Sequence, residues 1–151
     1  DSHEGFVNIS STWKNKELDP FNQLIKSGDA PAIMPGHLIH KRIASDGVPV
    51  SISKPAISGL LRKKLNYSGL VISDDLQMGA IAKNYSYKNT IIRAVNAGVD
   101  ILMISNSRKP DANLPAKTIA LISKAIDEGK IAPGKIESAY KRIMRAKATI
   151  K

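Results

Sequence analysis

The sequence predicts an α/β protein with a parallel β-sheet, because one pattern of helix, glycine, short apolar strand and polar turn occurs three times. The three segments are residues 17–37, 54–75 and 88–107. In each of them a glycine follows the helix, where a helix end often needs a residue in the left-handed conformation. Each strand is apolar without alternation, which is typical of a sheet that is covered on both faces.

Apolar residues at helical spacing predict the helix before each strand; in the second segment they are Ile57, Leu60, Leu61 and Leu65. The strands are expected at about 32–34, 70–73 and 101–104, lying side by side in chain order. After the third strand, one helix is expected over 114–128 and another from 133 to about 148, with a proline in its first turn. The first 16 residues and residues 41–53 are expected to be loops.

Three strands are too few for a complete sheet of this kind, so the pattern suits a barrel whose first strands lie outside the sequence. In such barrels, and in open parallel sheets, function lies at the carboxyl ends of the strands. Here those ends carry His37, Asp74 with Asp75, and Asn106. A doubly wound sheet would also fit, but no glycine-rich phosphate loop is present. We therefore expect a (β/α)8 TIM-type barrel, of which residues 1–151 form the C-terminal part: about the last three strands and their helices.

Composition narrows the classes of function. The 151 residues suit one domain, and 42% of them are hydrophobic. The chain has no Cys, which excludes disulfides and a thiolate nucleophile, and three His. The net charge of +10 is spread over several segments, which favours solvated helix faces over a nucleic-acid interface. The sequence contains no run long enough to span a membrane. We expect no metal and no cofactor.

The adjacent acids after the second strand are the first candidates for chemistry. Asp75 is placed to cap a short helix expected over 76–82. Asp74 can then be a catalyst, whereas a metal clamp is disfavoured because adjacent strand-end side chains diverge. Near the start, Asp1 and His3 form a D-x-H pattern in which an Asp can orient a His and raise its basicity. That pattern alone also suits an incidental surface loop.

Other candidates have plainer interpretations. His37 is expected to face substrate or to be a structural group at the rim of the sheet, whereas His40 is expected to be exposed. Trp13, the only Trp, could stack on a sugar, but an anchor that packs its loop onto the helices is preferred. The methionines Met34, Met78 and Met103 are interpreted as core or rim filler.

Four stretches, taken in order, resemble the catalytic barrel of bacterial β-N-acetylglucosaminidases of glycoside hydrolase family 3. They are "DSHEGF" with "STWKNKELDPF", "AIMPGH", "SISKPAISGLLRKKLNYSGLVISDDLQMGAI" and "NAGVDILMIS". The resemblance implies a retaining glycosidase that releases terminal N-acetylglucosamine from glycosides such as peptidoglycan fragments. It implies that Asp74 is the nucleophile and that His3, polarised by Asp1, is the general acid and base. His37 and Met78 are the residues expected to bind substrate.

The sequence also departs from this family. The family barrel has eight strands, and the K-H-F-P-G-H-G segment that normally precedes D-S-H and holds the sugar is not in the sequence. We therefore expect this chain alone to be inactive, and to pair with the N-terminal part of the barrel or with a second copy. A family 3 phosphorylase, a β-glucosidase-like relative and a non-catalytic half-barrel module remain alternatives. The compartment stays open between bacterial cytoplasm and periplasm.

An incomplete barrel would expose apolar side chains of its inner face. On the expected strands, the residues facing a partner should be Ile33, Val71 or Ile72, and Leu102 or Met103.

Overall fold

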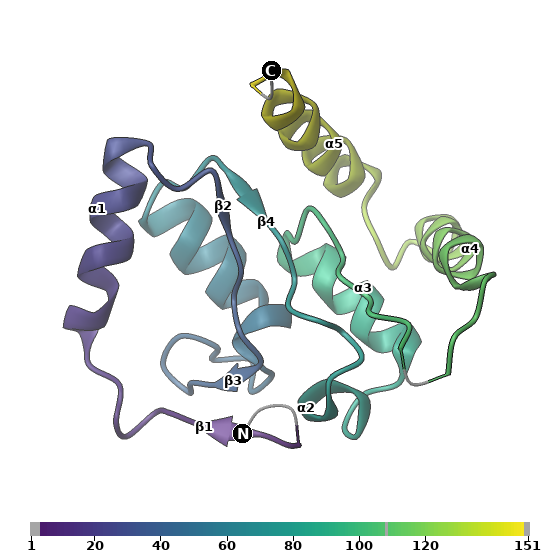
Figure 1. Cartoon of the computed structure of the whole chain (residues 1–151), viewed down its shortest axis with the longest axis horizontal. Helices are drawn as coiled ribbons and strands as arrows, with labels where there is room; N and C mark the ends of the chain where they lie inside the picture. The colour runs from purple at the N-terminus through teal and green to yellow at the C-terminus, as the bar shows by residue number, and fades with distance from the viewer. Residues whose placement is uncertain (1–3, 108, 150–151) are drawn as a thin grey trace.

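The computed structural model describes residues 4–107 and 109–149 as a mixed α/β piece built around parallel strands. Strands β2 (Ala32–Ile33) and β4 (Leu70–Val71) run side by side through the centre of Figure 1. They pair in parallel register, Ala32 with Leu70 and Ile33 with Val71. A parallel bridge joins Ile72 to Ile101, and the N–H of Ser73 donates to the Ile101 carbonyl at 2.9 Å. Three parallel segments adjacent in chain order are therefore confirmed.

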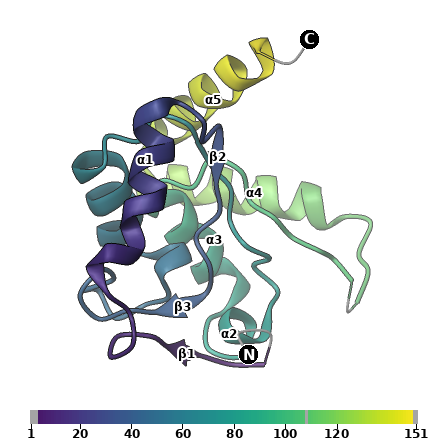
Figure 2. The same ribbon diagram turned by 60° about the vertical axis from the view of Figure 1, so that its left-hand side comes forward.

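The helices lie on one side of these strands. Helix α1 (Asp19–Ser27), helix η3 (Pro55–Lys64), helix α3 (Tyr87–Ala97), helix α4 (Leu114–Asp127) and helix α5 (Pro133–Ala148) follow the expected order. Figure 1 shows α1 at one side of the molecule and α4 and α5 at the other, and the turned view in Figure 2 brings α1 to the front with α4 extending away to the right. Of the residues that the structure describes, no helix covers the opposite face of the strands in Figure 1.

The N-terminal part of the chain is more ordered than the sequence suggested. Strand β1 (Val7–Asn8) pairs in parallel with β3 (Leu38–Ile39), and a short helix η1 covers Asn15–Leu18. The second expected loop contains another short helix, η2 (Val50–Ile52). The prediction of loops was wrong at these places, because strands of two residues are too short to show a period in the sequence.

The turn between η3 and β4 corrects one expected glycine role. Gly28 and Gly98 do cap their helices with φ of 83° and 102°. At the end of η3, however, Asn66 is the left-handed residue, with φ of 54°. Gly69 is needed for space instead: a Cβ there would lie 2.5 Å from the Tyr67 hydroxyl oxygen and 2.9 Å from the Pro31 carbonyl oxygen.

Helix η3 is of the π type along its length, which the sequence did not predict. The N–H of Leu65 bonds to the carbonyl of Leu60, five residues back, at 2.9 Å. A π-helix is wider than an α-helix and rarely persists beyond one turn, so an α-helix is the normal expectation for such a segment. The spacing of Ile57 and Leu61 fits an α-helix and therefore did not indicate the π-helix. Both of these side chains are nevertheless buried in the core, as the helical pattern indicated.

Alternate residues of the second strand face opposite ways. Val71 and Ser73 are fully buried on the helix side, whereas Ile72 and Asp74 are only partly buried. Ile33 and Leu102 also pack against the core. The face away from the helices therefore carries Ile72, together with the exposed methionines Met34 and Met103. Two of the expected inner-face positions were given as alternatives, and of these Ile72 and Met103 fit, whereas Val71 and Leu102 face the core. Ile33, expected on the inner face, packs against the core instead.

A buried carboxylate ties the amino ends of the strands to two helices. The Asp100 side chain has no exposed surface. Its Oδ2 accepts hydrogen bonds from the Arg62 guanidinium at 2.7 Å and from the Val71 N–H at 2.9 Å, and its Oδ1 accepts from Arg142 Nε at 2.8 Å. These bonds join β4, η3 and α5 through one residue. Burial of its guanidinium lowers the pKa of Arg62, against the opposing attraction of Asp100.

Replacing Asp100 by Ala should destabilise the chain by about 3–5 kcal/mol, because two arginines would lose the buried charge that compensates them. Urea unfolding followed by circular dichroism measures this change. Glu128→Ala, which removes exposed ion pairs with lysines, is the matched control and should have a much smaller effect. Equal losses in the two variants would show that the Asp100 cluster is not a structural tie.

Candidate active site

The carboxyl ends of the strands meet at one edge, where the two adjacent acids have different partners. Asp74 Oδ1 accepts the N–H of Asp75 at 2.8 Å, and no other described residue hydrogen-bonds to the Asp74 carboxylate. Asp75 Oδ1 accepts the N–H of Gln77 at 3.1 Å and the N–H of Ser105 at 3.0 Å. The carboxylate of Asp75 is thus used to hold the edge together, whereas the carboxylate of Asp74 accepts one hydrogen bond from the residues that the structure describes.

Electrostatics support the structural role of Asp75. Burial alone would raise the pKa of its carboxyl group, but the hydrogen bonds from Ser105 and Gln77 outweigh burial, and the pKa is lowered. The sequence predicted that Asp75 caps a helix that begins at residue 76. The structure contradicts this prediction. Helix α2 (Gly79–Ala82) begins later, with Met78 at its N-cap, because residues 75–78 form a turn that the Asp75 side chain closes.

His37 lies beneath this edge with no exposed surface. Its Nε2 is 2.8 Å from the Asp75 carbonyl, which can only accept, so Nε2 carries the proton. Its Nδ1, 2.5 Å from Ser51 Oγ, then accepts the hydroxyl proton. Both ring nitrogens are occupied, so the structure places His37 as a support for the backbone of the acidic turn. Its predicted contact with substrate stays a prediction.

The residues that follow the third predicted strand form the other part of this edge. The N–H of Asn106, a residue in the left-handed conformation with φ of 53°, donates to Gln77 Oε1 at 2.7 Å. The Asn106 side chain closes its own loop by two bonds of 3.0 Å with the backbone of Asp111. Gln77, Ser105 and Asp111 were not singled out from the sequence. Their roles depend on contacts between segments that are distant in the sequence, and no local sequence pattern predicts such contacts.

Met78 is buried, with 9% of its surface exposed, and its N–H donates to the Asp75 carbonyl at 3.0 Å. Its predicted contact with substrate is therefore not visible in this conformation and stays a prediction. Asp1 and His3 lie outside the described residues. The segment that follows them is fixed at the same end of the molecule: Lys83, after α2, donates to the Glu4 carbonyl at 2.6 Å, and β1 lies near α2 in Figure 1.

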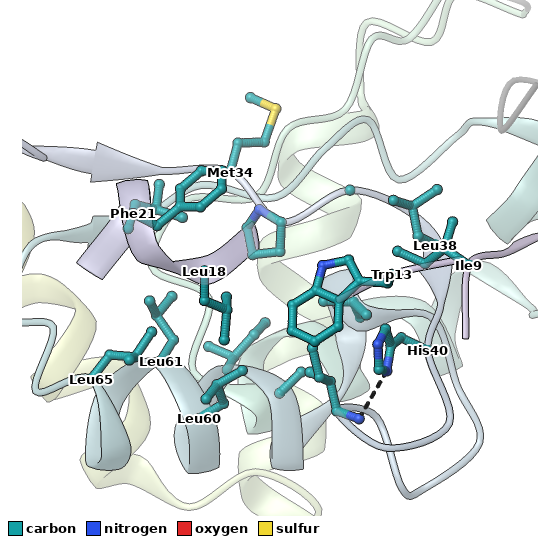
Figure 3. A pocket seen from close by; sticks show the side chains of 17 residues that line it. Ile9, Trp13, Leu18, Phe21, Met34, Leu38, His40, Leu60, Leu61 and Leu65 are labelled. Atoms are coloured by element: carbon teal, nitrogen blue, oxygen red, sulfur yellow. Dashed lines mark hydrogen bonds between the residues drawn. The ribbon is translucent and has the colours of Figure 1, made fainter. Parts of the chain in front are cut away.

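His40 is buried, with 1% exposure, so the expectation of an exposed side chain was wrong. The Trp13 ring packs edge-to-face on it, with 4.7 Å between ring centroids. Trp13 also lines an apolar pocket together with residues of η3 (Figure 3), in agreement with the anchor interpretation. This pocket does not include Asp74 and is separate from the acidic edge.

No group of three or more His, Asp or Glu residues among the described residues is arranged to hold a metal ion. None of the helices formed by these residues has the length and apolar character needed to cross a membrane.

The chain is similar to known carbohydrate-active proteins along most of its length. Residues 1–146 match the glycosyl hydrolase family 3 N-terminal domain. The chain is 40% identical over 93 residues to a beta-hexosaminidase of Haemophilus influenzae, and 35% identical over 111 residues to that of Tolumonas auensis. These matches cover 62% and 72% of this chain, but only 26% and 33% of the relatives, so the chain spans about a quarter to a third of their length.

Solved structures give the same result for the fold. Zinc-bound CbsA from Thermotoga neapolitana superposes with a TM-score of 0.85 at 29% identity, covering 100% of this chain and 34% of that chain. A glycoside hydrolase family 3 beta-N-acetylglucosaminidase from Paenibacillus sp. FPU-7 has a TM-score of 0.80 at 29% identity, covering 98% and 28%.

The lowered pKa of Asp75 predicts an acid-sensitive contribution to stability. Because the folded-state pKa lies below the unfolded one, this contribution is present above about pH 4 and is lost as the pH falls through the folded pKa. The difference in unfolding free energy between the wild type and Asp75→Asn should therefore be constant above pH 5 and shrink below pH 4. Urea unfolding from pH 6 to pH 2.5 measures it, with Glu137→Gln on α5 as control. A difference that does not change with pH would contradict the structural role of Asp75.

Proposed function

The chain belongs to glycosyl hydrolase family 3, through the family's N-terminal domain, and on this premise we propose that it is part of a retaining exo-β-N-acetylglucosaminidase. The observation that carries the proposal is the division of labour between the two acids. Asp75 accepts backbone hydrogen bonds that hold the edge, whereas the Asp74 carboxylate, at the carboxyl end of the strand, accepts one N–H bond from within residues 4–107 and 109–149.

In the proposed mechanism, Asp74 is the nucleophile. Its carboxylate oxygen attacks the anomeric carbon and forms a glycosyl ester while the glycosidic C–O bond breaks, through an oxocarbenium-like transition state. Water then attacks the same carbon, the ester bond breaks and the carboxylate is regenerated. The N–H of Asp75 donates to Asp74 Oδ1 at 2.8 Å and so orients the carboxylate at the end of the strand.

We assign the proton transfers to His3, oriented by Asp1. His3 donates a proton to the leaving oxygen in the first step and removes a proton from water in the second, a double role that suits an imidazole near neutral pH. Support comes from the adjacent residues: Lys83, at the C-terminal end of α2, donates to the Glu4 carbonyl and so holds the residue after His3 beside this helix. His37 positions the turn of residues 75–78 through the Asp75 carbonyl.

The proposed substrate is a glycoside with terminal β-linked N-acetylglucosamine, such as a peptidoglycan fragment. The relatives support this class, because they are described as beta-hexosaminidases and as a beta-N-acetylglucosaminidase. Hydrolysis is the proposed reaction, with water rather than phosphate as the acceptor.

We further propose that residues 1–151 are the C-terminal part of a TIM-type catalytic barrel and act with the rest of that barrel. The face of the strands that carries Ile72, Met34 and Met103 has no covering helix among the described residues. Exposed apolar patches of this kind mark contact surfaces. The similar structures contain about three times the length of this chain, so the remainder of the barrel is the partner that fits better than a second copy.

Activity should require both parts of the barrel. The chain alone should not hydrolyse a chromogenic N-acetylglucosaminide, and adding a separately produced N-terminal part of a family 3 barrel should restore release of the chromophore. An Asp74→Asn chain is the matched control, since it should still assemble but stay inactive. Hydrolysis by the isolated monomeric chain would contradict the proposal.

The same assembled enzyme tests His3. His3→Ala should slow substrates with poor leaving groups by about 10²–10⁴-fold, on the usual scale for general acid catalysis, and activated aryl glycosides much less. Equal losses for both substrate classes would exclude His3 as the acid.

A further inference from the structure

A polar pocket lies at the amino end of β4, the opposite end of that strand from the acidic edge. Its volume is about 220 Å³, and its walls come from η3, from the turn that contains Tyr67 and Ser68, and from α5. Figure 1 shows α5 near the start of β4, whereas α2 lies at the other end of the molecule. We call this cavity the Arg142 pocket, after the arginine between its two walls. It is smaller than the roughly 300–1,000 Å³ of pockets for drug-sized ligands.

The wall that α5 contributes is basic and polar. It consists of Ser138, Lys141, Arg142 and Arg145. Residues spaced by three, four and seven positions lie on one face of a helix, and here that face is turned toward η3 and the start of β4. A helix that packs on a sheet usually presents apolar residues at this spacing. The hydroxyl and the three cations in their place indicate that this face serves a purpose other than core packing.

Positive charge in the Arg142 pocket exceeds the negative charge that the described residues bring to it. Four cations line it: Arg62, Lys141, Arg142 and Arg145. Among the described residues, the ion pairs of these four are those of Arg62 and Arg142 with Asp100, whose two oxygens both already accept hydrogen bonds. Burial lowers the pKa of Arg62, and the nearby charge of Arg142 lowers it further, against the attraction of Asp100. One carboxylate therefore faces four cations, which favours a further anion at this place.

Donors that could hold such an anion are present in the pocket. Arg142 uses its Nε–H for Asp100, and its two Nη groups have no hydrogen-bond partner within residues 4–107 and 109–149. In the same part of the chain, the charged ends of Lys141 and Arg145 and the Ser138 hydroxyl also have none. Arginine forks and hydroxyl groups are the usual ligands of phosphate oxygens. Several donors around one small cavity match a tetrahedral phosphate, with three or four acceptor oxygens, better than a planar carboxylate with two.

We propose that the Arg142 pocket binds a phosphate group, either as the free ion or as the terminal phosphate of a small molecule. The phosphate oxygens accept from Arg142 Nη, from the ends of Lys141 and Arg145, and from the Ser138 hydroxyl, while Asp100 holds the Arg142 side chain in position. No residue of the acidic edge lines this pocket. The site also lies away from the two open edges of the strands, because β4 is the middle one of the three parallel segments. The proposal is independent of the catalytic function proposed above.

Three anions test this site in the whole chain: inorganic phosphate, glucose 6-phosphate and acetate, each at pH 7 and at an ionic strength fixed with sodium chloride. The Nε–H signals of Arg142 and Arg145 in a ¹H–¹⁵N spectrum report on the pocket, and those of Arg42 and Arg93, outside it, are internal references. Phosphate should shift the pocket signals to saturation and bind about tenfold more tightly than acetate. Tighter binding of glucose 6-phosphate than of phosphate would assign the site to a phosphate ester, and the reverse order to the free ion. Equal binding of phosphate and acetate, or shifts of all four arginines alike, would overturn the proposal, because either shows general attraction to a basic surface.

Two variants on α5 separate the pocket from net charge. Arg145→Gln removes one exposed cation of the pocket and should weaken phosphate binding about tenfold, the scale of one hydrogen bond to a charged group. Lys147→Gln removes a cation from the same last turn of the helix but outside the pocket, and should leave binding unchanged. Neither residue contacts Asp100, so both variants keep the buried cluster. Equal losses in the two variants would contradict the proposal.

The assembled barrel is the last arm of the test. Adding the separately produced N-terminal part should leave the phosphate affinity unchanged. Loss of phosphate binding on assembly would overturn the proposal by showing that the remainder of the barrel covers the Arg142 pocket.

Discussion

The buried carboxylate of Asp100 is the interaction on which the arrangement of the strands depends. It forms ion pairs with Arg62 and Arg142 and also accepts the N–H of Val71, so it fixes the amino ends of two adjacent strands against two helices. Parallel strands anchored at one end place their other ends together. The acidic pair therefore meets Ser105 and Asn106 at one edge, although the residues are 30 apart in the sequence, and the Ser105 N–H donates to Asp75 there.

Much of the architecture could be predicted because it follows from periodicity. The order and parallel direction of the central segments, and the positions of α4 and α5, followed from apolar spacing and helix-end residues. The β1–β3 pair could not, because strands of two residues have no detectable period. Gly69 was misjudged because a glycine needed for space looks the same in sequence as one needed for a left-handed turn, the role that Asn66 takes.

The candidate site could likewise be predicted only in part. The sequence predicted both acids at a strand end. In the described part of the structure they differ in their partners: the N–H groups of Gln77 and Ser105 donate to Asp75, and only the N–H of Asp75 donates to Asp74. Burial of His40 could not be predicted, since it depends on Trp13 packing across from a distant segment. The proposed role of His3 rests on the D-x-H pattern and the family resemblance, with the Lys83 contact to Glu4 as support, since His3 lies outside the described residues.

The most direct test of the central claim, that Asp74 and not Asp75 is the nucleophile, is to trap the glycosyl ester. The barrel assembled from both parts would be treated with a 5-fluoro N-acetylglucosaminyl fluoride, chosen so that the glycosyl–enzyme hydrolyses slowly, and then digested and sequenced by mass spectrometry. The account predicts one added sugar on Asp74, and none in Asp74→Asn. A sugar on Asp75, or turnover by Asp74→Asn at the wild-type rate, would contradict it.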